Sequence, residues 1–342
     1  MTLARVLSTF IVAIIVGGCQ PAGTGAEAGG RTMGTTWTVR VTTCSLDDCN
    51  AALAELVGQR LAELNHIFSH YDPDSEVSSF NRYSGTDWFP VSDQLAEVVT
   101  LAQRISAISN GAFDITVAPA VDAWGFGAEP LTADIPAEAT IAAAAGTTGY
   151  RNLEVRTEPP ALRKSDPALR IDLSAIAKGY AVDQLAYLLE REGMRDYLVE
   201  IGGELRVAGN RADGQAWRIG IEPPDNGDTT QPRIEYIVEP GDQAVASSGD
   251  YRNFYTVGDK RISHMIDPAT ARPVSNGLAA VSVVAPSAAQ ADALATALMV
   301  LGPDRAMTLA EREGLAVMLT ERADDGLTVR QTAAFSGYLL DY

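Results

Sequence analysis

The sequence predicts an α+β protein in which mixed sheets and packed helices form a single unit. Segments with the two-residue period of strands and segments with helical periodicity are interspersed, without the regular alternation that a doubly wound parallel sheet requires. The chain has 342 residues, of which 46% are hydrophobic and 20% are charged, as is typical of a globular protein with a sizeable core. No internal repeat is present, which argues against a solenoid or a propeller.

Boundary signals place the elements of the first half. Residues 36–43 alternate as a strand does, and residues 47–66 have helical periodicity with Asp47 as a good N-cap. Ser92 marks the expected start of a second helix. The segment between the two helices, residues 70–81, is rich in polar and turn-forming residues and sustains neither period, so we expect an ordered loop there.

The second half of the chain mixes short strands with helices. We expect helices over about residues 175–191 and, after the cap residue Ser287, over residues 288–301. The apolar run at residues 278–285 is typical of a buried strand. The other expected elements are a helix over residues 303–314 and strands at 197–201, 217–221, 234–238, 278–285, 315–320 and 327–332.

The N-terminus has the three parts of a secretory signal. Arg5 supplies the basic part, residues 6–16 form an apolar run too short to span a bilayer, and a stretch of small residues ends at Cys19. That stretch resembles a bacterial lipobox, in which Cys19 is lipidated; a cleaved soluble precursor is the alternative. We expect a periplasmic protein anchored by lipid to a membrane, the inner rather than the outer one. The expected parts are a lipoprotein signal peptide (1–18), a flexible tether (19–30) and one domain (31–342).

Cys44 and Cys49 are the other two cysteines. In an oxidising periplasm a pair at this spacing favours a small disulfide over a metal site, because two thiolates without nearby histidine hold zinc poorly. The closed loop is short, so we expect its contribution to stability to be local.

The charge balance excludes one class of ligand. Lys and Arg total 26 against 44 Asp and Glu, which gives a formal net charge of −18. Nucleic acid as a general ligand would have to bind against the mean field of the protein. A single phosphorylated small molecule is compatible with this charge if a metal ion or backbone amides offset the repulsion.

Asp292 and Thr296 lie four residues apart on an expected helix, so their side-chain oxygens project from one face. This spacing suits Mg²⁺, which takes one or two protein oxygens and completes its shell with phosphates, carbonyls and water. On this pattern alone, a solvated or capping aspartate is the alternative.

Three further residues are candidates for chemistry. Asp172 precedes an expected helix and either caps it or contacts a ligand. Lys178 is one of three lysines in a chain that otherwise uses Arg, and it suits an anionic ligand. His264, between a strand and an Asp-Pro turn, suits proton transfer or phosphate stabilisation, with a structural hydrogen bond as the alternative.

Eight short strings along the chain form a larger pattern. They are Met33-Gly34-Thr35; Tyr71-Asp72-Pro73-Asp74-Ser75-Glu76 with Phe80-Asn81; Gly111-Ala112-Phe113-Asp114 with Trp124-Gly125-Phe126-Gly127; Asp172-Leu173-Ser174-Ala175-Ile176-Ala177-Lys178-Gly179-Tyr180; Ile201-Gly202-Gly203-Glu204; Ser248-Gly249-Asp250-Tyr251; Ser263-His264-Met265-Ile266-Asp267-Pro268; and Ala291-Asp292-Ala293-Leu294-Ala295-Thr296. In this order they resemble the ApbE family of flavin transferases, from about residue 31 to 321. The resemblance implies the ApbE-like, T-fold-related fold as a single catalytic unit.

The activity that the resemblance implies is Mg²⁺-dependent transfer of FMN from FAD to a threonine hydroxyl of a target redox protein, with a phosphoester formed and AMP released. The implied partners are flavin-carrying redox subunits, such as those of ion-translocating oxidoreductases. An FAD pyrophosphatase that yields FMN and AMP, or a flavin-binding lipoprotein without activity, are the alternatives.

The resemblance also implies the site residues. Asp292 is implied in catalysis together with His264, which either helps to deprotonate the hydroxyl or steadies the pyrophosphate. Mg²⁺ is implied at the side chains of Asp292 and Thr296 and at the main-chain oxygen of Ala175. Contacts with FAD are implied for Met33, Tyr71, Ala112, Phe113, Asp114, Asp172, Lys178 and Ile266.

The chain departs from the family pattern at two positions. Ala271 and Ala118 stand where the family commonly has glycine. These departures concern the geometry of local turns more than the chemistry.

Overall fold

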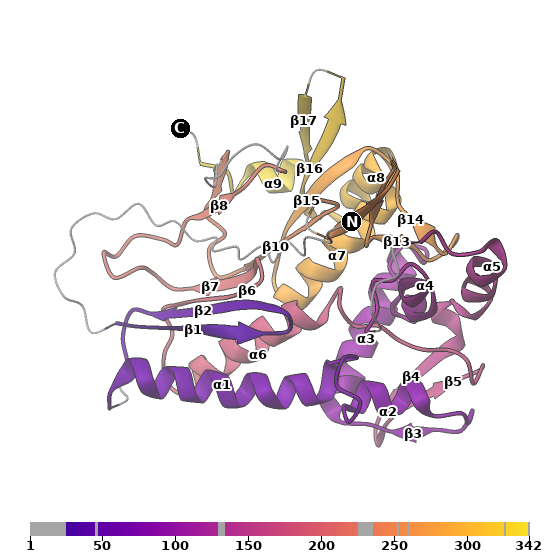
Figure 1. The fold of residues 1–342 in the computed structure, drawn as a ribbon. Coiled ribbons are helices and arrows are strands. Elements are labelled where there is room, and N and C mark those ends of the chain that lie inside the picture. Colours follow the sequence, from indigo (N-terminus) through magenta and orange to yellow (C-terminus); the bar gives the residue numbers. More distant parts are fainter. Residues whose placement is uncertain are drawn as a thin grey trace.

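The fold is built on one eight-stranded sheet in which every pair of neighbouring strands is antiparallel (Figure 1). It is seen in a computed structural model that describes residues 25–44, 47–128, 134–224, 235–251, 253–258, 260–324 and 326–340. The antiparallel pairing confirms the α+β class. In spatial order the strands are β1 (Ala26–Thr32), β2 (Thr35–Val41), β6 (Tyr197–Ile201), β7 (Glu204–Ala208), β10 (Ala244–Gly249), β15 (Leu278–Ala285), β16 (Ala316–Ala323) and β17 (Gly326–Gln331).

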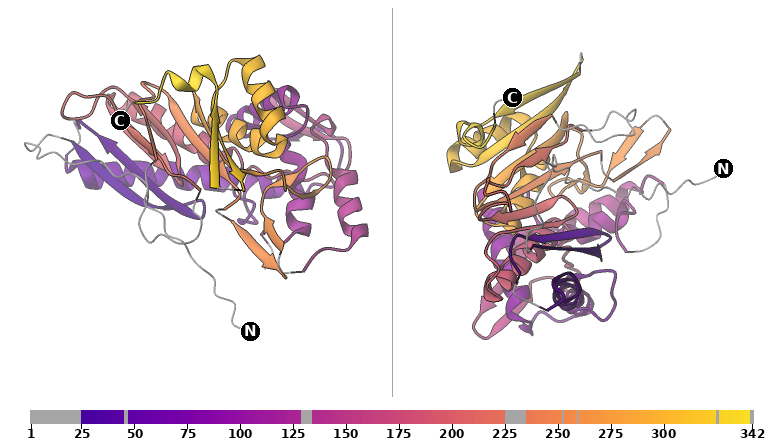
Figure 2. Two further views of the ribbon diagram at one scale, coloured as in Figure 1. Left: turned by 90° about the horizontal axis from the view of Figure 1, so that it is seen from above. Right: turned by 90° about the vertical axis from the view of Figure 1, so that its left-hand side faces the viewer.

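Three helices cover one face of this sheet. Helix α1 (Cys49–Phe68) packs on β1, α6 (Ala177–Arg191) on β6 and β7, and α7 (Ala288–Leu301) on β10 and β15. Figure 2 shows α1 almost end-on beneath the β1–β2 hairpin. The main core lies between these helices and the sheet, and α8 (Pro303–Glu313) packs against α7 and β16.

Strand β15 contributes to two cores because its side chains alternate between the faces of the sheet. Val281 and Val283 belong to the main core, whereas Val284 belongs to a smaller core on the opposite face. Trp217 and Phe335 are buried in that smaller core. The elements that contribute to it beside the sheet are β8 (Ile219–Ile221), β9 (Tyr236–Val238) and α9 (Ala333–Ser336).

The remaining elements lie beyond one end of the helical layer (Figure 1). A small sheet has the order β3-β5-β4, and a hairpin of β11 and β12 extends outward from the body in both views of Figure 2. The bounds are α2 (Glu76–Arg82), β3 (Phe89–Pro90), α3 (Asp93–Ile108), η1 (Ile115–Val117), α4 (Ala118–Ala123), α5 (Glu138–Thr147), η2 (Tyr150–Asn152), β4 (Leu153–Thr157), β5 (Pro160–Lys164), β11 (Phe254–Val257), β12 (Lys260–Ser263), β13 (Ile266–Asp267) and β14 (Arg272–Pro273).

The expectation of a loop over residues 70–81 is wrong for its second half, which forms α2. Ser75 is the N-cap, and its hydroxyl accepts a hydrogen bond from the backbone N–H of Ser78 at 3.1 Å. A serine cap followed by Glu76 in the first turn is a helix-start signal. The seven-residue helix is too short for its periodicity to be recognised.

The expectation of a flexible tether is wrong for residues 26–30, which belong to β1. This strand pairs with β2 along its whole length, from Ala26 opposite Val41 to Thr32 opposite Thr35. Its glycines permit close packing: a Cβ on Gly30 would lie 2.8 Å from the indole nitrogen of Trp37. A glycine at position 30 therefore leaves room for the Trp37 ring. The expected signal peptide, Cys19 and the start of the expected tether lie outside the described residues.

The first helix begins one residue later than expected. Its N-cap is Asp48, which has a φ of 46° and makes no side-chain capping hydrogen bond, and the expected cap Asp47 lies outside the helix. The expected disulfide is present between Cys44 and Cys49, and it ties the first helical residue to the end of the β2 segment. In the described part of the chain, no helix combines the length and the apolar character needed to cross a membrane.

Lys164, at the end of β5, is a fully buried lysine. Its ammonium donates a hydrogen bond to the carbonyl oxygen of Leu169 at 3.0 Å and lies 5.2 Å from the centre of the Phe80 ring. Burial lowers the pKa of this ammonium, and nearby Asp166 partly opposes the effect. The lysine thus joins α2 and β5 to the chain that approaches Asp172.

The lowered pKa of Lys164 predicts a pH dependence of stability. Between the lowered value and the ordinary value near 10.5, the unfolded chain binds more protons than the folded one, so the free energy of unfolding rises with pH. Lys164→Met lacks this contribution. Urea unfolding from about pH 8 to about pH 10 should therefore show the wild type gaining stability relative to Lys164→Met. Two parallel stability curves would contradict this assignment.

Candidate active site

One cavity of about 760 Å³ collects segments from across the chain. This volume is typical of small-molecule sites. The β1–β2 turn, the ends of α1 and β10, the starts of α6 and β7, and the inner face of α7 all contribute to its walls. Every site residue that the resemblance implied lines it: Met33, Tyr71, Ala112, Phe113, Asp114, Asp172, Ala175, Lys178, His264, Ile266, Asp292 and Thr296.

Lys178 lies between two buried carboxylates at the floor of the cavity. Its ammonium nitrogen is 3.3 Å from Oε1 of Glu204 and 3.7 Å from Oδ2 of Asp292. Both acidic residues are only 3% exposed, and the lysine compensates part of their charge. The start of α6, the start of β7 and the middle of α7 therefore meet at one charged cluster.

The predicted pair on α7 faces the cavity with different partners. Oδ2 of Asp292 accepts a hydrogen bond from the backbone N–H of Gly179 at 3.2 Å. The hydroxyl of Thr296 lies 3.3 Å from the hydroxyl of Ser248 on β10. The i, i+4 spacing thus puts a carboxylate and a hydroxyl on the cavity wall as expected.

The charged residues in the described lining of the cavity are mostly acidic. Four carboxylate residues line it, Asp114, Asp172, Glu204 and Asp292, against one lysine, Lys178. A pyrophosphate group entering such a site needs a further cation or a set of backbone N–H donors. The charge of the cavity therefore repels a phosphorylated ligand, as the net charge of the whole chain does.

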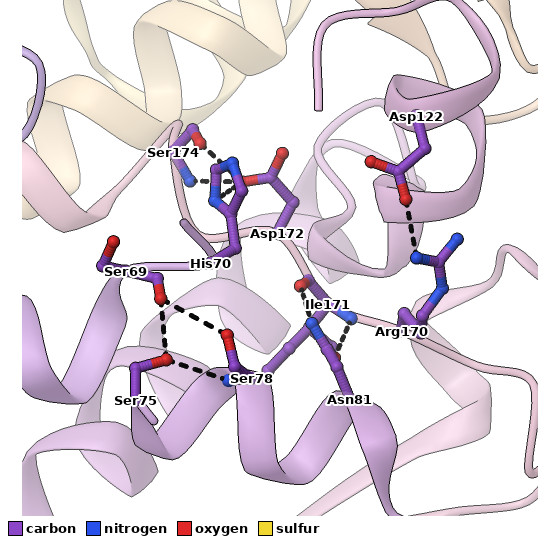
Figure 3. A network of polar contacts seen from close by, with 10 residues as sticks. All are labelled: Ser69, His70, Ser75, Ser78, Asn81, Asp122, Arg170, Ile171, Asp172 and Ser174. Carbon is purple, nitrogen blue, oxygen red and sulfur yellow. Dashed lines mark hydrogen bonds and ion pairs between the residues drawn. The ribbon is translucent and has the colours of Figure 1, made fainter. Parts of the chain in front are cut away.

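Asp172 is held at the cavity edge by its own loop and by a histidine (Figure 3). Its Oδ1 accepts hydrogen bonds from the backbone N–H and the hydroxyl of Ser174 at 2.8 and 2.6 Å. Nδ1 of His70 lies 3.6 Å from the same oxygen. The α6 helix begins only at Ala177, so Asp172 shapes the loop before the helix and does not cap it.

Asn81 connects α2 to the segment that carries Asp172 (Figure 3). Its side-chain amide donates to the carbonyl of Ile171 and accepts from the N–H of the same residue, both at 2.8 Å. The paired bonds imitate a rung of a β-ladder. Arg170, one residue further back, forms an ion pair with Asp122 of α4 at 2.6 Å. The backbone on the N-terminal side of Asp172 is thereby fixed from two helices.

Asp114 lines the cavity, but its carboxylate accepts hydrogen bonds from neighbouring chain segments. Oδ1 accepts from the N–H and hydroxyl of Thr116, and Oδ2 accepts from the N–H of Tyr150 at 2.6 Å. Burial raises the pKa of Asp114, and these hydrogen bonds oppose the shift. The residue thus organises the cavity wall formed by Ala112 and Phe113.

Two aromatic residues, Phe113 and Tyr71, also line the cavity. Phe113 is buried, whereas Tyr71 is 63% exposed and lies over the His70 ring with 4.1 Å between the ring centres. Desolvation raises the pKa of the Tyr71 phenol, followed by repulsion from Asp172 and Asp122. The phenol is therefore neutral and can stack on a planar ligand at the mouth of the cavity.

His264 follows directly after the β11–β12 hairpin. Its Nδ1 lies 2.9 Å from the carbonyl oxygen of Asn253, at the base of the same hairpin. Because a carbonyl can only accept, Nδ1 carries the proton, and in the neutral ring the basic lone pair resides on Nε2. The hairpin thus fixes the tautomer of a histidine that lines the cavity.

The two departures from the family pattern differ in their structural effect. Ala118 has ordinary right-handed helical backbone. Ala271 has a φ of 53°, the left-handed region that favours glycine, and its carbonyl accepts a hydrogen bond from the Trp124 indole at 2.7 Å. Of these two positions, only Ala271 therefore carries backbone strain.

Sequence reasoning missed two residues at the site, Glu204 and His70. Glu204 ends the string Ile201-Gly202-Gly203-Glu204, and its burial opposite Lys178 depends on the pairing of β6 with β7. His70 lies directly before the string that begins at Tyr71. The available signal was a charged or titratable residue inside a string that resembled the family for Glu204, and directly before such a string for His70.

Fold and cavity together define the class of flavin transferases. The structure matches the flavin transferase ApbE from Vibrio cholerae with a TM-score of 0.84 at 38% identity, covering 92% of this chain and 99% of that one. It matches the Pseudomonas stutzeri flavinyl transferase ApbE, apo form, with a TM-score of 0.82 at 37% identity, covering 91% and 96%.

The chain belongs to the ApbE family, whose family model matches residues 33–319. It is 38% identical over 327 residues to the FAD:protein FMN transferase of Vibrio cholerae serotype O1, covering 95% of this chain and 96% of that protein. It is also 38% identical over 314 residues to the FAD:protein FMN transferase of Escherichia coli K12, covering 91% and 88%.

The clamp between Asn81 and Ile171 predicts a specific loss of local order. Asn81→Ala leaves the N–H and carbonyl of Ile171 without their partner, so we expect the free energy of unfolding to fall by about 2 kcal/mol. Amide hydrogen exchange at residues 169–174 should become faster. A matched control is Thr332→Val, which loses hydrogen bonds to the backbone of Val317 and Leu315 outside the cavity. Equal exchange in the two variants would refute the clamp.

Proposed function

We propose that this protein is an FAD:protein FMN transferase that attaches FMN to a threonine of a redox protein. The observation that carries the proposal is the convergence of Lys178, Asp292, Thr296 and His264 on one cavity. The family membership and the names of its relatives support the same activity.

The reaction needs one bond formed and one broken. The threonine oxygen attacks the FAD phosphorus nearer the flavin, the bond to the second phosphate breaks, and AMP leaves. The proton of the hydroxyl must be removed, and Nε2 of His264 can accept it in the tautomer set by Asn253. Steadying the pyrophosphate by the protonated ring is the other role that this position allows. Lys178 contributes positive charge at the cavity floor.

The residues present fit a magnesium ion that is shared with the substrate. Asp292 and Thr296 offer a carboxylate and a hydroxyl oxygen on one helix face, and Ala175 lines the same cavity with a main-chain oxygen to offer. Across the described ranges there is no cluster of three or more His, Cys, Asp or Glu suited to a metal. Two or three oxygens suit Mg²⁺, which accepts phosphates and water as its other ligands. When bound, the ion would neutralise the charge that develops on the phosphates.

We place the protein in the bacterial periplasm, lipid-anchored through Cys19 to a membrane, the inner membrane in our proposal. The signal-like N-terminus supports this location, and the Cys44–Cys49 disulfide is compatible with an oxidising compartment. A membrane anchor would keep the enzyme close to its acceptors, which we propose are flavin-carrying subunits of membrane redox complexes.

The transfer reaction is tested with purified protein, FAD, Mg²⁺ and an acceptor domain that carries the threonine. Flavin fluorescence should remain with the acceptor after denaturation, and AMP should appear in equal amount. The same acceptor with valine in place of the threonine should stay unlabelled. Free FMN and AMP without labelled acceptor would show an FAD pyrophosphatase, and unchanged FAD would show a binding protein; either result rejects the transferase.

Asp292→Ala tests the proposed metal site. We expect the rate of Mg²⁺-dependent AMP release to fall at least ~100-fold, because the charge stabilisation that the ion supplies amounts to several kcal/mol. The control is Asp304→Ala, the same change at a carboxylate that is 93% exposed on α8 and lies outside the cavity. Near-normal AMP release by Asp292→Ala would refute the metal assignment.

A further inference from the structure

Helices α6 and α7 approach each other unusually closely where α7 begins. A Cβ built on Gly179 of α6 would lie 2.3 Å from the carbonyl oxygen of Ala288 and 2.8 Å from the Cα of Ala289. Both contacts are with backbone, which cannot rotate away as a side chain can. Glycine is therefore the only residue that permits this crossing without moving one of the helices.

Asp183, one turn further along α6, caps the start of α7. Its two carboxylate oxygens accept hydrogen bonds from the N–H groups of Ala288 and Ala289, each at 2.9 Å. The next two N–H groups of α7 are satisfied by Ser287, whose hydroxyl accepts from Gln290 and whose carbonyl accepts from Ala291. The N–H groups of the first three residues of α7 are thus bonded by side chains, two of them by a neighbouring helix, and Ala291 makes the first intrahelical bond.

The Asp183 carboxylate is held in place by neighbouring groups and does not line the cavity. Asp183 is 4% exposed and is absent from the cavity lining. Arg206 of β7 donates to its Oδ1 at 3.1 Å, so the buried carboxylate is balanced by a cation. A negative charge at a helix N-terminus is also favoured by the helix dipole.

The capped turn leads directly to the proposed metal oxygens. Asp292 follows within one turn of the cap, and its Oδ2 accepts the N–H of Gly179. Lys178, on the same turn of α6, lies 3.7 Å from that oxygen. The axial position of α7 relative to α6 therefore sets the distance between the lysine and the carboxylate.

We infer that Asp183 is a positioning residue for the reaction: by capping α7 from α6, it holds Asp292 and Thr296 in register with Lys178. The inference rests on the proposed function, since it assigns those oxygens to a divalent cation. A change at Asp183 should act on cation binding far more than on metal-free binding of FAD, because the aromatic walls of the cavity come from other segments.

The test is Asp183→Asn in the full-length protein. The amide retains one acceptor oxygen but presents an NH₂ group to the second N–H of α7. With Mn²⁺ as the probe and FAD present, we expect its dissociation constant, measured by EPR, to rise at least ~10-fold. The dissociation constant of the variant for FAD without metal should stay within about twofold of the wild-type value measured in parallel.

A matched control separates positioning from general loss of stability. Asp196→Asn changes a carboxylate that accepts the N–H of Asn210 at 2.8 Å outside the cavity. The two variants are compared by thermal unfolding as well as by Mn²⁺ binding. If Asp183→Asn weakens Mn²⁺ binding no more than Asp196→Asn does, Asp183 is merely structural and the inference fails.

A second variant perturbs the same helix contact by another route. Gly179→Ala places a methyl group against Ala288 and should displace α7, so it should reproduce the ~10-fold or greater loss of Mn²⁺ affinity. Gly58→Ala on α1 is its control, since a Cβ there meets nothing within 4 Å. Normal Mn²⁺ binding by both Gly179→Ala and Asp183→Asn would overturn the inference.

Failure of the proposed metal site is distinguishable from failure of this inference. If the wild type binds no Mn²⁺, the metal assignment is wrong, and Asp183 is then judged by FMN transfer alone. A loss of transfer more than ~10-fold beyond that of Asp196→Asn would still support positioning. An equal loss in the two variants would exclude it.

Discussion

The contact between α6 and α7 is the one on which the rest of the site depends. It brings backbone to backbone at Gly179 and Ala288, and it joins the helix that carries Lys178 to the helix that carries Asp292. The antiparallel sheet supplies the flat support on which both helices lie. Loops from distant parts of the chain then close the cavity around this pair, which explains why the site residues are dispersed along the sequence.

Electrostatics impose the second constraint. A cavity with several carboxylates and one lysine binds a diphosphate poorly unless a cation arrives with it. In the reaction that we propose, the enzyme and its substrate would each supply part of the coordination shell of that cation. Such sharing would make the affinity for the ion depend on the nucleotide, and the affinity for the nucleotide depend on the ion.

Much of the fold was accessible from the sequence because local signals were strong. Ser287 announced α7, and the apolar run of β15 marked a strand buried on both faces. The short helix after Ser75 was misjudged, since seven residues give little periodicity. Contacts between distant segments were not readable at all: nothing local to Asp183 indicates that its carboxylate caps a helix more than a hundred residues away. The same holds for the burial of Glu204 against Lys178.

Strand β1 has a consequence for how the protein would sit at a membrane. The strand begins at Ala26, seven positions after Cys19. Even when fully extended, a segment of seven residues spans only about 25 Å. With the lipid that we propose on Cys19, Ala26 would lie within about this distance of the membrane surface, which would favour acceptors whose threonine is presented near the bilayer.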